Sequence, residues 1–326
     1  MEQIDKMKRS CLRLGVVLMT LCWGVSTGWA QLQVDVRCIE VIATDHLGVN
    51  LAYPSTIFYD QAEDEIYITD ASKGQLVICT ADYFPHMAVG EGRGLRTIYS
   101  CCLEGERLYV CQGISKENSR GQIEILNRAF LREGSIYFSG FDRSESFLPG
   151  KLAVGADSNL YVVGVNSSPV IVLDRDGKYL RSIIPRDQIL GVTEPASIVS
   201  IAIGKDGRMY FLSEAFGRVF VYDRDERFLY KFGEKGGDRG KLARPRGIAV
   251  DDEKGRIYIV DYLRHTISVY SIDGKFLFDF GGKGYSRGWF VYPSDICIDG
   301  FGRLLITDTF NHRVQVFEVN EKGSDS

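Results

Sequence analysis

Short runs of β-branched and aromatic residues alternate with polar positions along the chain after residue 33, and this pattern returns six times. The second run of each copy provides a marker residue, and the six markers are Tyr67, Tyr109, Tyr161, Tyr210, Tyr258 and Leu305. Successive markers lie 42, 52, 49, 48 and 47 residues apart. Alternation with a period of two predicts β-strands, and a repeat of nearly constant length indicates a repeat architecture.

Each copy contains four such runs separated by turn sequences. In the fifth copy we expect strands at 247–251, 256–261, 266–271 and 276–280. Asp-Gly pairs, as at 206–207 and 273–274, are typical of the tight turns that join antiparallel strands. A four-stranded antiparallel sheet repeated at this spacing is typical of a propeller blade. The sequence therefore predicts an all-β, six-bladed propeller, because stacking around an axis buries the faces that one blade alone leaves exposed.

The two ends of the chain complement each other. The last copy has only three runs and stops at 314–319, while an orphan apolar run occupies 36–42. Pairing of this N-terminal strand with the last copy would complete the sixth blade and remove the open edge of the ring.

The last two copies also resemble a known repeat family. The resemblance is carried by Phe280-Gly281, Pro293, Asp308-Thr309, Asn311-His312-Arg313-Val314 and Val316-Phe317, with matching residues in the fifth copy at Phe232-Gly233, Pro245, Gly247-Ile248-Ala249-Val250 and Asp261. This pattern resembles the NHL repeat of six-bladed propellers. The first and second copies depart most from it. The resemblance implies the fold and says little about function.

The N-terminus has the composition of an export signal. Four basic residues within 1–13 precede an apolar run at 14–25, and Gly28-Trp29-Ala30 places small residues at the positions that a signal peptidase reads. We expect residues 1–30 to be a cleaved secretory signal, 31–320 to be the propeller and 321–326 to be a polar tail. The alternative is an uncleaved anchor, although the apolar run is short for a membrane span. We expect no stable membrane insertion after cleavage.

Charge and cysteine content narrow the classes of partner. Without residues 1–30, the chain has 35 basic and 41 acidic residues, a balance of −6. We therefore expect no nucleic-acid partner. Export permits disulfides, but the remaining cysteines fall within predicted strands, which favours buried thiols. Their disulfide state stays open at this stage; they are Cys38, Cys79, Cys101, Cys102, Cys111 and Cys297.

The predicted connections are unequal in length. In an up-and-down blade, the loops from second to third strand and from blade to blade share one face. On this face the long connections are 44–53, 113–120, 140–148, 185–194, 233–244 and 282–292. We call it the long-loop face, and the opposite one the short-turn face. Loops on a rigid scaffold commonly carry function, so we place the binding surface on the long-loop face near the central channel.

Arginine and aromatic residues are interleaved in these loops, in blades four to six. Such residues are common anchors of interfaces and suit anionic groups. The predicted binding residues are Arg239, Arg244, Arg246, Tyr262, Arg264, His265, Arg287, Trp289, Tyr292 and Phe310. The alternative interpretation is that several of them belong to the repeat and only pack or cap.

Aspartates recur at the end of the second strand, as Asp70, Asp261 and Asp308. Three carboxylates in a ring could bind a metal, but an Asp after a strand more commonly accepts backbone N–H groups from the following loop. Apart from Asp295, the inner strands offer few carboxylates for calcium, and the four histidines do not cluster in the sequence as zinc ligands do. We expect no metal and no cofactor.

Two hypotheses about function follow. The first is an exported binding or scaffold propeller that recognises a protein, a peptide or an anionic polymer with its long-loop face. The alternative is an enzyme, a hydrolase or lyase that acts on a small molecule in the channel. The chain contains no nucleophile elbow of the Gly-x-Ser-x-Gly type, which favours the first hypothesis.

Overall fold

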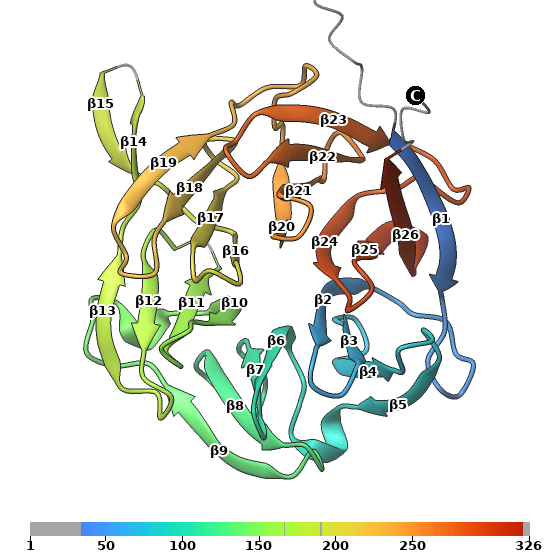
Figure 1. The fold of residues 1–326 in the computed structure, drawn as a ribbon. Coiled ribbons are helices and arrows are strands. Elements are labelled where there is room, and N and C mark those ends of the chain that lie inside the picture. The colour runs from blue at the N-terminus through green and yellow to red at the C-terminus, as the bar shows by residue number, and fades with distance from the viewer. Residues whose placement is uncertain (1–33, 166, 190, 322–326) are drawn as a thin grey trace, which may run out of the picture. The chain divides into compact units, whose positions relative to one another are not determined.

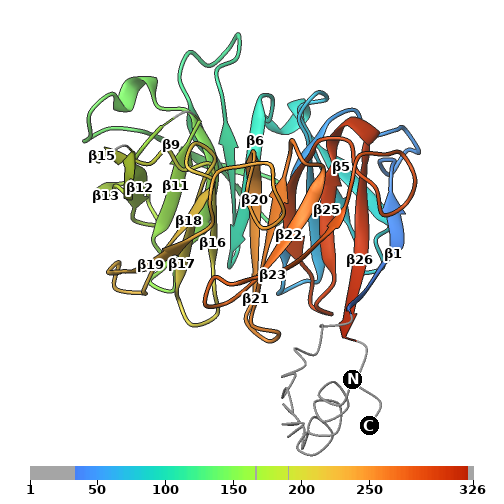
Figure 2. The same cartoon turned by 90° about the horizontal axis from the view of Figure 1, so that it is seen from above.

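Six four-stranded antiparallel sheets surround a central axis (Figure 1). The structure is a computed structural model that describes residues 34–165, 167–189 and 191–321. The first strand of each sheet lies nearest the axis. Seen from above, the inner strands run along the axis, so that the connecting loops gather at the two ends of the ring (Figure 2). The prediction of a six-bladed all-β propeller is confirmed.

The strands follow one another outward in each blade. Blade one is β2 (Pro54–Asp60), β3 (Glu65–Asp70), β4 (Gln75–Cys79) and β5 (Pro85–Val89). Blade two is β6 (Ile98–Glu104), β7 (Arg107–Gln112), β8 (Gln122–Asn127) and β9 (Arg132–Tyr137). Blade three is β10 (Pro149–Val154), β11 (Leu160–Gly164), β12 (Val170–Leu173) and β13 (Tyr179–Ile183).

The second half of the ring follows the same order. Blade four is β16 (Ser200–Ile203), β17 (Met209–Ser213), β18 (Arg218–Tyr222) and β19 (Phe228–Phe232). Blade five is β20 (Pro245–Asp251), β21 (Arg256–Asp261), β22 (Thr266–Ser271) and β23 (Phe276–Gly281). Blade six is β24 (Pro293–Ile298), β25 (Leu304–Asp308), β26 (Arg313–Glu321) and β1 (Val34–Ile42). In the described ranges, three short 3₁₀ turns lie in loops: η1 (Glu91–Arg93), η2 (Ser144–Ser146) and η3 (Thr309–Asn311).

The N-terminal strand closes the ring. The sixth sheet has the order β1-β26-β25-β24, so β1 pairs with the last strand of the chain as its outermost member. The blue β1 and the dark red β26 lie side by side in Figure 1. This confirms the predicted closure, which leaves no blade incomplete among the described residues.

The hydrophobic core is divided among the contacts between neighbouring blades. Among the described residues there are six buried clusters, one at each junction of two blades. Blades four and five, for example, share Tyr210, Val219, Ile248 and Ile257, each 3% exposed or less. Because every blade packs both of its faces against neighbouring blades, aromatic and β-branched side chains are buried on both sides of each sheet.

One loop contains structure that the sequence did not suggest. We predicted 185–194 as a long connection, and it forms a hairpin of β14 (Arg186–Ile189) and β15 (Val192–Pro195). The hairpin extends outward beside blade four in Figure 1. The buried Asp187 fastens it there, because its carboxylate pairs with Arg218 of β18 and Lys231 of β19.

The six cysteines of residues 34–321 are all free thiols, and four of them are buried. The preference for buried thiols is thus confirmed for Cys79, Cys101, Cys102 and Cys111. The predicted export signal at 1–30 and the tail at 322–326 lie outside the described residues. Within the described part of the chain, no helix combines the length and the apolar character needed to cross a bilayer.

Candidate functional site

A cavity of about 670 Å³ opens at the mouth of the central channel, on the long-loop face. All six blades contribute to its lining, mostly with the first residues of their inner strands and with residues just beyond their second strands. We call it the mouth cavity. Its volume lies within the range of about 300–1,000 Å³ that is usual for small-ligand pockets.

The inner strands begin with an irregularity that shapes this cavity. In β10, Pro149 pairs with Gly164 and Lys151 with Val163, so Gly150 is an extra residue in the ladder. Equivalent shifts occur at the start of β2, β6, β20 and β24. Bulges of this kind bend a strand and re-aim its side chains. They set the direction of the side chains that surround the mouth.

Two arginines and a tyrosine form one wall of the mouth cavity. The Nε of Arg244 donates to Oε1 of Glu214 over 2.8 Å, and the Nε of Arg246 lies 3.0 Å from Oε2 of the same carboxylate. Both guanidinium groups lie over the ring of Tyr262, at 5.2 and 5.6 Å from its centroid. Shared pairing and cation–π contact hold the two cations side by side in a fixed orientation.

A row of aromatic rings continues from this wall across the long-loop face. Tyr262 packs on Tyr292 with 4.7 Å between centroids, Tyr292 meets Phe310 at 5.2 Å, and Phe310 meets Tyr53 at 5.6 Å. Phe310 remains 44% exposed. This row connects blades five, six and one, so that three predicted binding residues form one surface.

His265 supports this row from below rather than from the surface. It is 7% exposed, and its Nδ1 accepts a hydrogen bond from the backbone N–H of Tyr292 over 2.9 Å. Burial and the nearby Lys283 lower the pKa of its imidazole. Both His265 and Tyr292 have positive φ, 58° and 51°, which is uncommon outside glycine. The neutral ring thus fixes Tyr292 in a strained backbone position.

The floor of the mouth cavity is an ion pair across the channel. The ammonium of Lys151 on β10 contacts Oδ1 of Asp295 on β24, and these strands belong to blades three and six, on opposite sides of the axis in Figure 1. Oδ2 of Asp295 accepts the N–H of Ile57 over 3.0 Å. The Asp295 side chain is 2% exposed and that of Lys151 16%.

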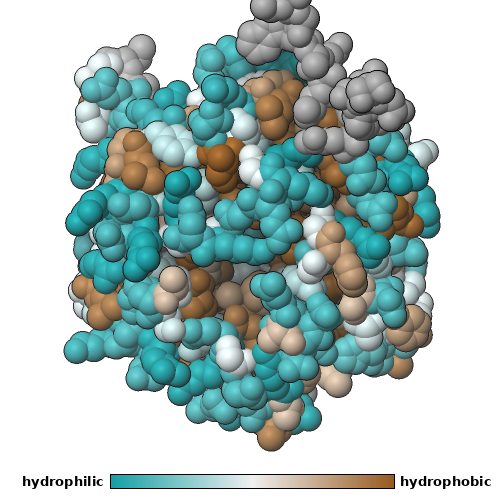
Figure 3. Space-filling model, in the orientation of Figure 1, coloured by the Kyte–Doolittle hydropathy of each residue, from teal (hydrophilic) through white to brown (hydrophobic). Residues whose placement is uncertain are grey.

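Below this pair the channel continues as a second cavity of about 360 Å³ between the inner strands. Figure 3 shows one face of the ring, which is largely hydrophilic and is hollowed at the centre. Cys101, Cys102 and Cys297 line the channel. Burial raises the pKa of all three thiols, that of Cys102 to about 12. Protonated thiols are poor nucleophiles, so these cysteines pack rather than react.

The other predicted binding residues lie away from the mouth cavity, toward the outer part of blades five and six. Arg264 is directed to Asp279 of the outer strand β23, at 2.8 Å, and Arg239 pairs with the same residue at 3.5 Å. Arg287 lies 3.8 Å from Glu40 of β1. Trp289 is 49% exposed and rests against the backbone of the 282–284 segment. The predicted residues therefore divide into two groups. The mouth group lines the cavity or belongs to the aromatic row beside it: Arg244, Arg246, Tyr262, His265, Tyr292 and Phe310. The rim group lies further out: Arg239, Arg264, Arg287 and Trp289.

The recurring aspartates cap backbone groups, as we predicted, but most of the donors come from another loop. Asp70 accepts the N–H groups of Ala52 and Tyr53, and Asp261 those of Ala243 and Arg244. These donors precede the first strand of the blade, whereas we expected donors after the second strand. A donor of the expected kind is found at Asp261, which also accepts the N–H of Arg264 over 3.3 Å. Each carboxylate thus fixes the loop that enters its own blade. No group of three metal-ligating side chains lies close together in the described part of the chain.

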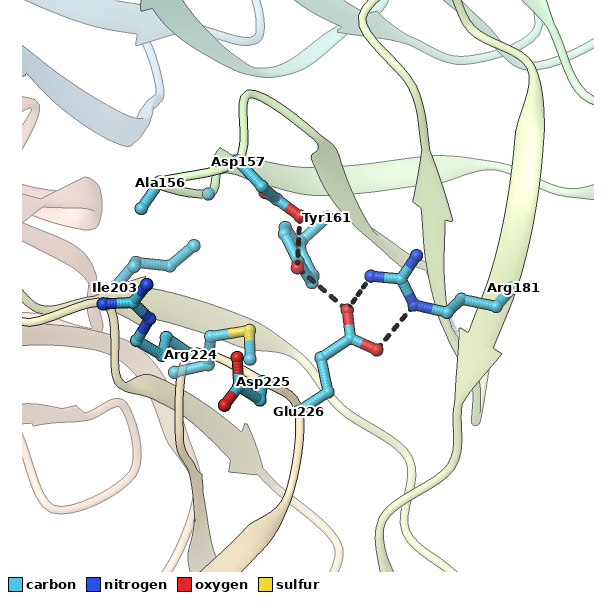
Figure 4. Close-up of a pocket in the computed structure, with 11 residues that line it drawn as sticks. Ala156, Asp157, Tyr161, Arg181, Ile203, Arg224, Asp225 and Glu226 are labelled. Atoms are coloured by element: carbon cyan, nitrogen blue, oxygen red, sulfur yellow. Dashed lines mark hydrogen bonds and ion pairs between the residues drawn. The ribbon is translucent and has the colours of Figure 1, made fainter.

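A further cavity of about 630 Å³ lies on the short-turn face, between blades three and four (Figure 4). Glu226 receives Arg181 in a two-point contact and also accepts the hydroxyl of Tyr161 over 2.9 Å. Burial and this carboxylate raise the pKa of Tyr161. The network links a turn of blade four to two strands of blade three, which is the arrangement of an inter-blade clamp.

Sequence reasoning did not identify Lys151, Glu214, Tyr53 or Tyr99 as residues of the mouth. A signal for the floor was present. Lys151 and Asp295 each stand two residues after the proline that begins an inner strand, Pro149 and Pro293. Equivalent positions three blades apart face each other across the axis, so opposite charges there predict a pair.

Comparison with known proteins agrees with this architecture. The model of the NHL repeat matches residues 242–270 and 290–317, which lie in blades five and six and their approach loops. Comparison with curated protein sequences gives no match.

Solved structures are similar over most of the chain at low sequence identity. A protein of unknown function from Bacteroides thetaiotaomicron superposes with a TM-score of 0.63 and 17% identity, over 88% of this chain and 76% of that one. An auxiliary nutrient binding protein from the same organism gives 0.61 and 13%, over 89% and 78%. Virginiamycin B lyase from Staphylococcus aureus gives 0.55 and 10%, over 88% and 99%. At such identities the likeness shows the fold alone. The chain is a six-bladed β-propeller that carries NHL repeats in its fifth and sixth blades.

Proposed function

We propose that this protein is an exported binding propeller that captures a peptide or a protein segment in the mouth cavity of its long-loop face. One observation carries the proposal: a cavity to which all six blades contribute and in which two arginines are held against one tyrosine. Preorganised arginine and tyrosine side chains lose little conformational freedom on binding and are common energetic centres of interfaces.

The aromatic row supports a protein or peptide ligand. Phe310 and Tyr53 extend the wall of the cavity outward over blades six and one, and the loop that leads to Tyr53 carries two exposed apolar side chains, Leu47 and Val49. A ligand that enters the mouth with one end would lay its following part on this row. The rim group, with Arg287 and Trp289, lies further out and would contact a larger partner.

The enzyme hypothesis receives less support. A hydrolase or lyase of the channel needs an activated nucleophile or a polarising group there. The channel thiols are held protonated by burial, and the Asp295 carboxylate is engaged by Lys151 and Ile57. The similar fold of a lyase does not change this balance, because one fold supports many functions.

A display library of random peptides would test the proposal. Peptides selected on the wild-type protein would be measured by isothermal titration against Arg246→Ala and Tyr262→Ala, with Arg224→Ala on the short-turn face as the matched control. We expect the mouth variants to weaken binding at least tenfold, which corresponds to about 1.4 kcal/mol. Equal affinities for all variants would contradict a mouth site. Trp289→Ala would report separately on the rim.

Export is part of the proposal and has its own test. The composition of the N-terminus supports it. N-terminal sequencing of the protein from its native cell should give a chain that starts at Gln31. A chain that retains residue 1 would show that the segment is not cleaved.

A further inference from the structure

We propose that the mouth cavity receives the C-terminal end of a peptide or protein chain, whose terminal carboxylate accepts hydrogen bonds from Lys151. This inference rests on the proposed function and adds to it the chemistry and the orientation of the ligand. It is carried by the hydrogen-bonding capacity of the mouth and by the shape of its floor.

The floor holds a cation with unused donors. An ammonium group has three N–H donors, and among the described residues Lys151 has one acceptor, Oδ1 of Asp295. Its side chain is 16% exposed and lines the open mouth cavity, so its other two donors are available to a ligand that enters the cavity. A carboxylate oxygen at this position would form a charge-assisted hydrogen bond with the ammonium.

The wall of the cavity adds donors of the same kind. Arg244 and Arg246 both direct Nε toward Glu214, and in the described part of the chain their terminal Nη groups have no hydrogen-bond acceptor. The carboxylate acceptors of the mouth are already occupied. The two Glu214 oxygens face the arginines, its backbone oxygen accepts Lys235, and Asp295 is used by Lys151 and Ile57. Donors in excess of acceptors favour a ligand that brings oxygen acceptors and negative charge.

The floor also limits how a ligand can enter. The contact between Lys151 and Asp295 spans the axis at the level where the mouth cavity meets the channel below, because both residues line both cavities. Gly247 leaves room for this pair, since a Cβ there would lie 2.8 Å from the Cα of Asp295. The ion pair therefore lies across the passage from the mouth cavity to the channel below, in the path of an entering ligand.

A cavity with an ion pair across its floor favours chain ends. The carboxylates of an anionic polysaccharide lie along its length, and an interior segment has to fold to bring one of them to the floor of the cavity. A polypeptide carries a carboxylate at its very end, followed by amide and side-chain groups that would reach Arg246 and Tyr262. Recognition of a C-terminal carboxylate by fixed donors is an established mode of peptide binding. The geometry therefore favours a peptide terminus.

The test compares peptides that differ only at the carboxylate. N-acetylated random tetrapeptides would be synthesised as free acids and, in isotope-distinguished form, as C-terminal amides. An equal mixture would be incubated with the mature protein, and the retained peptides counted by mass spectrometry. We expect free acids to be retained about tenfold or more over their amides, as the loss of a charge-assisted hydrogen bond implies. Equal retention of acids and amides overturns the inference while leaving peptide capture intact.

Two substitutions at the floor sharpen the result. Lys151→Gln should abolish the preference for free acids, whereas Asp295→Asn should keep or increase it, because the lysine then lacks its protein partner. If Lys151→Gln does not fold, the comparison of acid and amide on the wild type decides alone. A preference that survives in a folded Lys151→Gln protein contradicts the assignment of Lys151.

Further arms separate this inference from the proposed function. If neither acids nor amides are retained, and if Arg246→Ala does not change the affinity for the peptides selected by display, the proposal of peptide capture by the mouth cavity fails as a whole. If an oligomer of a uronic acid displaces the retained peptides at equal carboxylate concentration, the carboxylate source is a polysaccharide and the inference of a peptide terminus is wrong. Arg224→Ala on the short-turn face should leave every result unchanged.

Discussion

Replacement of Lys151 by methionine would test the nature of the channel floor. The substitution keeps an unbranched side chain of similar length but leaves the carboxylate of Asp295 with one described partner, the N–H of Ile57. Asp295 is 1% exposed. Breaking a buried ion pair by removing one partner costs about 3–5 kcal/mol, because a desolvated charge remains. Since domains are stable by only about 5–15 kcal/mol, this is a large fraction of the whole.

The assay is urea unfolding of the mature protein followed by circular dichroism. We expect Lys151→Met to lower the free energy of unfolding by about 3–5 kcal/mol. The double variant Lys151→Met with Asp295→Leu should recover most of this loss, because replacement of both partners by apolar residues is commonly neutral. A single variant as stable as the wild type would refute the reasoning that the pair is buried and coupled. So would a double variant no more stable than the single one.

Three other predictions concern the surroundings of this site. Gly247→Ala should destabilise the protein by about 1–3 kcal/mol, because the added methyl group would overpack against Asp295. The control Gly134→Ala in β9, where an added Cβ has no neighbour within 4 Å, should be neutral or slightly stabilising. Equal urea midpoints for the two variants would contradict this prediction. Asp308→Ala should lower the free energy of unfolding by about 3–5 kcal/mol in the same assay, because this fully buried carboxylate accepts the Val291 N–H and several side-chain donors. A smaller loss of stability than that of Gly247→Ala would be inconsistent with the capping role. Burial lowers the pKa of His265, so the unfolded chain binds more protons than the folded one as pH falls below about 6.5. The free energy of unfolding should therefore fall below this pH in the wild type, and fall less in His265→Asn. Parallel pH profiles of the two proteins would contradict this prediction.

Much of the fold could be predicted because each blade repeats a local pattern. The strands expected in the fifth copy at 256–261 and 266–271 coincide with β21 and β22, and 247–251 falls within β20. Closure by 36–42 followed from a copy with a missing strand. Even the first two copies, which depart most from the NHL pattern, form complete blades. The alternation of apolar and polar residues and the turn sequences determine the sheet, and the residues of the NHL pattern are not required for it.

The site could be predicted only in part, because it depends on where side chains of distant segments point. The loops were correctly assigned to one face, but sequence does not show that Arg264 turns outward to Asp279 while Arg246 turns inward. Lys151 and Asp295 are 144 positions apart in the chain, and their contact exists only because the ring has six blades. The hairpin at 186–195 was missed because β15 is exposed along its length and Asp187, which is buried on β14, is charged rather than apolar.

Hydrogen exchange of the protein with and without a selected peptide tests the central claim most directly, namely that the mouth cavity is where the ligand binds. The account predicts slower exchange at the amides of Arg244, Arg246 and Tyr262 and at those that follow the first proline of β10 and of β24, on the long-loop face around the axis. Protection confined to the turns of blades three and four, near Tyr161 and Glu226, would contradict it and place the ligand in the cavity of the opposite face.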